Sequence, residues 1–87
     1  MVAISYSKHF LVSAGKIPNN QQKKLARLLM IIHENPYHPK LHLKPLRGEL
    51  SGLYSFRITR DWRVIFQFIS PDLILLINVS HRKDIYR

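Results

Sequence analysis

The chain has 87 residues, enough for one domain and too few for two, since domains commonly contain about 100 to 150 residues. It has no cysteine, which excludes a disulfide framework, a thiolate zinc site and a cysteine nucleophile. Fourteen Lys and Arg against five Asp and Glu give a formal charge of +9, which favours a polyanionic partner, nucleic acid first.

Residues 2–14 predict a short strand followed by a short helix. Apolar residues alternate with small or polar ones over residues 2–6, the period of a half-buried strand. Ser7 then offers a side-chain oxygen to cap a helix over residues 8–14, and Gly15 suits the left-handed residue that ends many helices. We therefore expect the strand and the helix to follow one another directly.

A longer helix comes next. Pro18 and the asparagines after it are typical of a helix start, and Asn35 followed by Pro36 predicts its end. Within it, apolar residues recur at i, i+3, i+4 and i+7, and these are Leu25, Leu28, Leu29 and Ile32. One face of this helix should therefore be buried. Residues 36–53 contain three prolines and two glycines, and we interpret them as a long exposed loop.

The hydrophobic period changes to two after residue 53 and predicts three strands. Residues 54–59 and 62–68 each carry apolar side chains on one face, and residues 73–79 form a nearly continuous apolar run, as in a central strand. Short turns join these strands into an antiparallel meander. The order predicts an α+β fold in which residues 1–87 form one domain, both helices pack on one face of the sheet and the other face is open.

The pattern of the first hairpin places two arginines together. A three-residue loop puts Arg57 directly opposite Arg63, with Cβ atoms about 5 Å apart, which is destabilising unless an anion such as phosphate lies between them. If residues 69–72 form the next loop, Asn78 lies beside Arg63, and Arg82 follows at the end of the same face. The competing interpretation is that these arginines only keep an exposed sheet from pairing with other chains. The residues alone leave both interpretations open.

One histidine is placed for chemistry. His81 lies where the last strand ends, near the predicted arginine cluster, and histidine is the side chain best suited to proton transfer near neutral pH. The alternative is that His81 is an ordinary surface or capping residue.

Several reaction classes lack the residues they need. The acidic residues are scattered, so the carboxylate clusters of two-metal nucleases and glycosidases are absent from the sequence. The three glycines fit neither the phosphate loop of ATP sites nor the dinucleotide fingerprint. RNA cleavage without metal or cofactor stays open, because the 2′-OH of RNA attacks its own phosphate and the protein need only move protons and stabilise charge.

No sequence feature indicates a membrane. The longest apolar runs, residues 28–32 and 73–77, fall far short of the ~20 residues that span a bilayer. The N-terminal residues do not have the basic and apolar regions of a secretory signal. We therefore expect a cytoplasmic protein without a membrane partner.

The chain resembles a known family over essentially its whole length. Residues 43–68, LKPLRGELSGLYSFRITRDWRVIFQF, followed by the apolar strand and SHRKDIYR, are similar to the C-terminal half of RelE/ParE superfamily toxins of bacterial type II toxin-antitoxin systems, and ENPYHPKLHLKPL fits the same family. The similarity is closest to the RelE, YoeB and YafQ branches. It implies a fold like that of small microbial ribonucleases and metal-independent cleavage of mRNA, usually in the ribosomal A site.

The resemblance also implies roles for individual residues. Arg63 matches the strand arginine that contacts the scissile phosphate, and Arg82 a second phosphate-stabilising arginine. His81 and Tyr86 match the C-terminal histidine of YafQ-like and tyrosine of RelE-like and YoeB-like enzymes, which completes the expected catalytic set. The expected substrate-binding residues are Lys44, Arg57, Arg60, Asp61 and Trp62. Lys44 stands where YoeB-like proteins carry a glutamate base and YafQ-like ones a histidine, so the identity of the base stays open.

The resemblance implies partners and leaves two rival functions. The partners are a cognate antitoxin and mRNA on the ribosome, at the A site of the 30S subunit with its rRNA. ParE-like members share the fold but poison DNA gyrase, and the joint presence of His81, Arg82 and Tyr86 argues against that function. The second rival is an inactive relative that binds RNA through its basic face without cleaving it.

Overall fold

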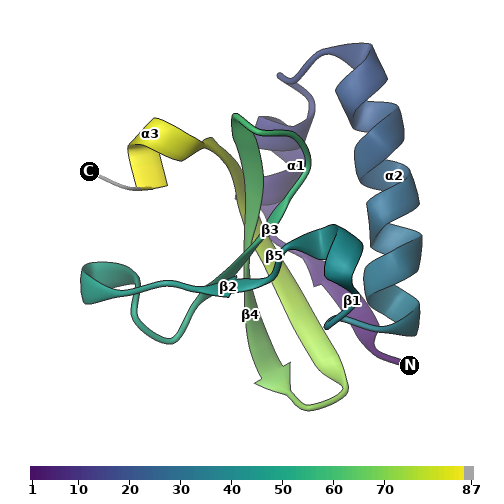
Figure 1. The fold of residues 1–87 in the computed structure, drawn as a ribbon, viewed down its shortest axis with the longest axis vertical. Helices are drawn as coiled ribbons and strands as arrows, with labels where there is room; N and C mark the ends of the chain where they lie inside the picture. The colour runs from purple at the N-terminus through teal and green to yellow at the C-terminus, as the bar shows by residue number, and fades with distance from the viewer. Residues whose placement is uncertain (86–87) are drawn as a thin grey trace.

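A computed structural model gives the fold and describes residues 1–85 (Figure 1). Along the chain the elements are β1 (Ala3–Tyr6), α1 (Lys8–Ala14), α2 (Asn19–Glu34), η1 (Pro39–Leu41), β2 (Lys44–Pro45), η2 (Gly48–Leu50), β3 (Tyr54–Arg57), β4 (Trp62–Ser70), β5 (Leu73–His81) and α3 (Arg82–Ile85), where η denotes a 3₁₀ turn. The predicted α+β class and the order of strand, helices and meander are confirmed.

The strands form one mixed sheet in the order β1-β5-β4-β3-β2. β3, β4 and β5 are the predicted antiparallel meander, while β1 pairs parallel to β5 and makes β5 a central strand. In Figure 1, α1 and α2 lie on one side of the sheet and α3 lies on the other, where the chain after the edge strand β2 also extends. The face predicted to be open is therefore flanked by these short elements.

The helices begin as the sequence predicts, but the first ends differently. The Ser7 hydroxyl accepts a hydrogen bond from the Phe10 N–H at 2.9 Å and caps α1. Gly15 has φ −69°, a right-handed conformation, so the predicted left-handed stop is wrong. The Gln22 amide nitrogen instead donates to the Ala14 and Ile17 carbonyls and satisfies the end of the helix. Within residues 1–85, no helix is both long and apolar enough to cross a bilayer.

The core lies between the two long helices and the sheet. The apolar face of α2 is buried as predicted through Leu25, Leu28 and Ile32, and Phe10 adds the contact from α1. The fully buried apolar side chains of β3, β4 and β5 are Phe56, Val64, Phe66, Ile74 and Leu76, and Ile58, directly after β3, is fully buried as well. These residues belong to the period-two faces of β3, β4 and β5, so the alternation seen in the sequence is the alternation between core and opposite face.

Residues 36–53 are more ordered than a long exposed loop, and that prediction is wrong in part. They contain two 3₁₀ turns and β2, which pairs antiparallel with β3. Leu41 is fully buried and Leu46 nearly so, because each is the apolar residue of a segment that packs against the domain. The Leu46 N–H donates to the Leu53 carbonyl at 2.9 Å and extends the pairing of β2 with β3 by one hydrogen bond.

The register of the second hairpin also differs from the prediction. β4 continues to Ser70 and turns over two residues, and the pairing of β4 with β5 shifts twice by a bulge or irregularity. Arg63 therefore lies opposite Ser80, and Asn78 lies opposite Ile65. An extra residue in one strand cannot be read from an almost uniformly apolar sequence, because every register keeps apolar pairs.

Candidate functional site

Two arginines face each other across the first hairpin. Arg57 of β3 pairs with Arg63 of β4 and Phe56 with Val64, which is the predicted register. Both arginines are half-buried, and Nε of Arg57 is buried without a hydrogen-bond partner among the described residues. Two adjacent guanidinium groups repel each other, and a buried donor without an acceptor costs further free energy. An anion between them relieves both effects.

Polar side chains surround this pair on the same face of the sheet. Ser80 lies opposite Arg63, and the Asn78 amide nitrogen donates to the Ser80 hydroxyl at 2.9 Å. In the next row, Lys44 of β2 lies opposite Ser55 of β3. The sequence predicts Asn78, and not Ser80, beside Arg63, because the irregular pairing of β4 with β5 that brings Ser80 there cannot be predicted from the sequence.

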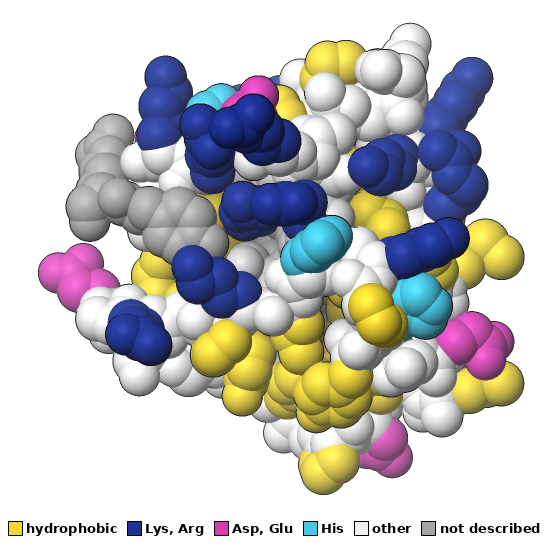
Figure 2. Space-filling view, in the orientation of Figure 1, with side chains coloured by type: hydrophobic (Ala, Val, Ile, Leu, Met, Phe, Trp, Pro, Cys, Tyr) yellow, Lys and Arg dark blue, Asp and Glu magenta, His cyan; other side chains and the backbone are white. Residues whose placement is uncertain are grey.

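The charge of this surface is strongly one-sided. Figure 2 shows Lys and Arg side chains gathered over the upper half of the molecule in this view, with Asp and Glu mostly at the margins. Residues of β2, η2 and α3 line an open hollow of about 720 Å³, and its Lys44 lies opposite Ser55, one row along β3 from Arg57. A basic, partly concave surface of this kind attracts and holds polyanions.

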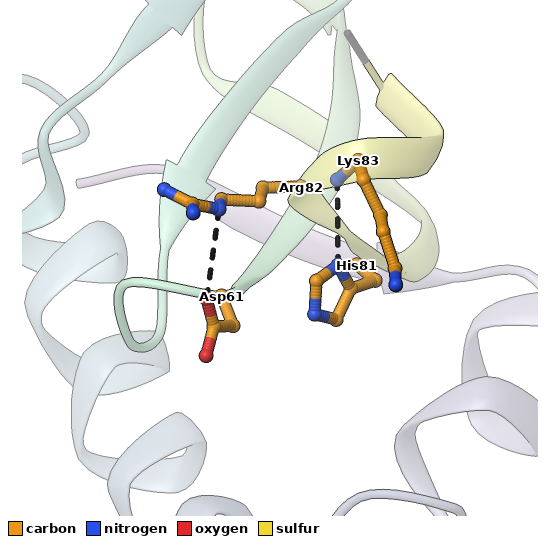
Figure 3. A network of polar contacts seen from close by, with 4 residues as sticks. All are labelled: Asp61, His81, Arg82 and Lys83. Atoms are coloured by element: carbon orange, nitrogen blue, oxygen red, sulfur yellow. Dashed lines mark hydrogen bonds and ion pairs between the residues drawn. The ribbon is translucent and has the colours of Figure 1, made fainter. Parts of the chain in front are cut away.

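Asp61 joins the β3–β4 turn to the start of α3 (Figure 3). The Arg82 N–H donates to the Asp61 carbonyl at 2.7 Å, and the Arg82 Nε lies 3.5 Å from the Asp61 carboxylate. About half of each side chain is exposed. The contact holds the Arg82 guanidinium at the turn between β3 and β4, and Arg60 in the same turn is exposed.

The Asp61–Arg82 pair should orient Arg82 without stabilising the fold much. We expect Asp61→Ala to lower the free energy of unfolding by less than about 1 kcal/mol, because solvent screens a half-exposed ion pair. Urea unfolding of Asp61→Ala, Arg82→Ala and the double variant gives the coupling free energy. A coupling well above about 1 kcal/mol would contradict this assignment.

His81 has a structural role that the sequence leaves as an alternative. Its Nδ1 accepts a hydrogen bond from the Lys83 N–H at 3.3 Å, in the manner of a residue that caps a helix (Figure 3). Its ring meets Trp62 edge-on with the centroids 5.2 Å apart. Trp62 pairs with His81, and the next pair is Arg63 with Ser80, so the two pairs point to opposite faces. The structure therefore does not bring His81 into the arginine pair.

The remaining predictions concern Tyr86 and metal ions. Tyr86 lies outside the described residues. Among residues 1–85, no group of three His, Cys, Asp or Glu side chains is placed to hold a metal ion. The polar groups of the arginine face are guanidinium, ammonium, hydroxyl and amide groups, which can all donate hydrogen bonds to an anion.

Two sequence comparisons with known proteins found matches. A family model described as the RelE-like toxin of the type II toxin-antitoxin system HigB matches residues 6–79. Endoribonuclease HigB of Proteus vulgaris is 43% identical over 37 residues, which are 42% of this chain and 38% of that protein, so the chain matches well under half of this relative's length.

Solved structures with the same fold cover nearly the whole chain. YafQ of Escherichia coli superposes with a TM-score of 0.78 at 18% identity, covering 100% of both chains. The RelB-RelE antitoxin-toxin complex of Methanococcus jannaschii gives a TM-score of 0.74 at 22% identity, covering 94% of each chain. At identities of 18–22%, these matches show that the chain has the same fold.

Proposed function

This chain belongs to the RelE-like toxins of the type II toxin-antitoxin system HigB, and from this premise we propose that it is an endoribonuclease that cleaves mRNA in the ribosomal A site without a metal ion. The observation that carries the proposal is the Arg57–Arg63 pair, two half-buried guanidinium groups in register on the sheet face opposite the buried Phe56 and Val64. The local match to endoribonuclease HigB adds support. Cleavage of mRNA would inhibit translation, the expected effect of a toxin.

The proposed reaction uses only the RNA and protein side chains. The 2′-oxygen attacks the adjacent phosphorus, the bond from phosphorus to the 5′-oxygen breaks, and the products carry a 2′,3′-cyclic phosphate and a 5′-hydroxyl. One proton leaves the 2′-OH and one is delivered to the 5′-oxygen. Negative charge grows on the phosphoryl oxygens in the transition state, where preorganised donors stabilise it most.

The arginines fit the charge-stabilising part of this reaction. Arg63 and Arg57 would hold the phosphoryl oxygens between them, and the Ser80 hydroxyl beside Arg63 offers a further donor. Arg82, oriented by Asp61, would approach from the end of the hairpin. Guanidinium groups are suited to this because each presents several donors in a fixed plane that matches a phosphate.

Proton transfer is assigned to His81 and Tyr86, with Lys44 as an electrostatic aid to the 2′-OH. Because the Nδ1 of His81 accepts the Lys83 N–H, a neutral ring carries its proton on Nε2, the nitrogen left for a ligand. The His81 side chain lies on the face of the sheet opposite the arginine pair, and a substitution at position 81 tests whether it takes part in proton transfer.

An asparagine at position 81 separates the two roles of this histidine. The Asn side chain can still cap α3, whereas it cannot transfer a proton near neutral pH. We expect His81→Asn to fold normally and to cleave about 100-fold more slowly, as for loss of a general acid or base. His81→Ala should lose about 1 kcal/mol of stability in addition. Wild-type cleavage rates in His81→Asn would leave His81 with the capping role alone.

An acidic antitoxin is the proposed protein partner. The M. jannaschii relative is solved as an antitoxin-toxin complex, and the +9 charge of this chain favours a partner of opposite sign. Electrostatic attraction between them should give fast association that weakens as salt is added.

The test is expression in growing bacteria beside the double variant Arg63→Ala, His81→Ala. We expect growth arrest and new mRNA 5′ ends in register with A-site codons for the wild type only. Arrest without new 5′ ends would point to a gyrase-type target and contradict the proposal. Absence of arrest, with the protein folded and abundant, would favour an inactive RNA-binding relative.

A further inference from the structure

The hollow beside the arginine pair is a built feature of the fold. Its walls come from β2, from η2 and from Ile85 of α3. Leu46 is 7% exposed and anchors the floor, while Gly48 has φ +66° and allows the chain to turn into η2. The volume of about 720 Å³ falls within the ~300–1,000 Å³ of sites for small molecules.

The hollow lies one register row from the arginine pair. Lys44, on its rim, pairs with Ser55, and Ser55 precedes Arg57 by two residues on the same face of β3. Rows of one face are about 6.6 Å apart along a strand, since a strand rises about 3.3 Å per residue. When a phosphate of the RNA is bound by the two arginines, the base of the adjacent nucleotide is therefore within reach of the hollow.

The lining has the chemistry of a base-binding surface. The walls are mainly apolar, and Lys44 and Arg47 contribute positive charge at the rim. None of the described lining residues is acidic. Bases extruded from single-stranded RNA bind to proteins through their faces, on apolar or aromatic surfaces, while cations hold the backbone. The positive rim favours a polyanion over a cationic or neutral ligand.

We infer that this hollow, lined by Lys44, Pro45, Leu46, Arg47, Gly48, Leu50 and Ile85, binds the base of the RNA nucleotide next to the phosphate held by Arg57 and Arg63. The inference rests on the proposed function and adds a second recognition element to it. Phosphate binding alone carries no sequence information, so this hollow would determine which bases flank the cut.

The first test uses methyl-labelled protein in NMR titrations with two matched ligands. One is a trinucleotide with 2′-O-methyl groups, which block self-attack, and the other is the abasic trinucleotide with the same phosphates. We expect the base-bearing ligand to shift the methyl signals of Leu46, Leu50 and Ile85 and to bind about tenfold tighter, as for one stacked base. Both ligands should shift the Arg57 and Arg63 Nε signals.

The outcomes separate the hollow from the arginine face. Silent methyl signals, or equal affinities for the two ligands, would overturn the inference while leaving the arginine assignment intact. Arginine signals unmoved by either ligand would instead count against the proposed function. Methyl shifts caused by an acidic peptide of alternating Glu and Leu, and by neither trinucleotide, would make the hollow a protein-docking site and also overturn the inference.

A charge-matched pair of variants tests the hollow in cells. Leu50→Glu places a carboxylate on its wall, and Leu11→Glu makes the same change on α1, where Leu11 is 59% exposed. We expect at least tenfold fewer cuts for Leu50→Glu, and wild-type cutting for Leu11→Glu. Leu50→Ala, which adds no charge, should change the bases that flank the cuts and covers the case in which Leu50→Glu does not fold. Unchanged flanking bases in folded Leu50 variants would contradict a base-binding hollow.

Discussion

Arg63→Ala is expected to slow RNA cleavage about 1,000-fold, at the upper end of the ~10²–10³ lost when one donor to transition-state charge is removed. Arg63 lies at the centre of the basic face, between Arg57 on β3 and Ser80 on β5. Its removal also ends the repulsion between two guanidinium groups, so the fold should not be weakened by loss of that contact. The measurement is the rate of appearance of mRNA 5′ ends after induction.

The matched control is Arg27→Ala. Arg27 is exposed on α2, and its substitution removes the same charge from the side of the sheet opposite the arginine pair. Cleavage by Arg27→Ala should stay within about twofold of the wild type. Equal losses in the two variants would mean that net charge, and not the placement of Arg63, supports the activity, and would sink the assignment of this face.

Phe66→Ala is expected to remove a large part of the stability of the domain. Phe66 is fully buried on β4 and its ring lies 5.4 to 5.9 Å from those of Tyr54, Phe56 and Phe68. Deleting a buried phenylalanine costs about 3–5 kcal/mol, because the cavity closes only in part. Small domains have only about 5–15 kcal/mol in total. Urea unfolding followed by circular dichroism gives the free-energy difference.

Ile69→Ala provides the comparison on the same strand. Ile69 is 52% exposed, so its truncation should change the free energy of unfolding by less than about 1 kcal/mol. A loss of under about 1.5 kcal/mol for Phe66→Ala would show that the aromatic cluster repacks around the gap, and would contradict its role as the centre of the core.

The first hairpin was predictable because two independent constraints agree. A three-residue loop and the apolar alternation of β3 and β4 permit only the register that joins Arg57 to Arg63, and the structure has it. The second hairpin offered no such agreement, since residues 73–77 of β5 are all apolar and the pairing of β5 with β4 is irregular. Ser80 was missed for this reason.

The site residues on the longer strands could be predicted from the sequence. The positions of those on short segments could not. The positions of Lys44 and of the hollow depend on β2, a two-residue strand within a segment rich in proline and glycine. The tie between Asp61 and Arg82 depends on contacts between a turn and a helix start that are 21 residues apart, 82 minus 61. No periodicity in the sequence encodes such contacts, since they follow from tertiary packing.

The pairing of β1 with β5 has a consequence for folding during translation. Ala3 pairs with Leu73, so β1 cannot pair until 70 further residues, 73 minus 3, have been synthesised. Chains grow at about 5–20 residues per second, and long-range strand pairing is slow in addition. Ser80, which lies opposite Arg63, is likewise absent until β5 has been synthesised. While the chain is still being translated, its sheet therefore lacks β5. The basic face can assemble only after nearly the whole chain has been synthesised.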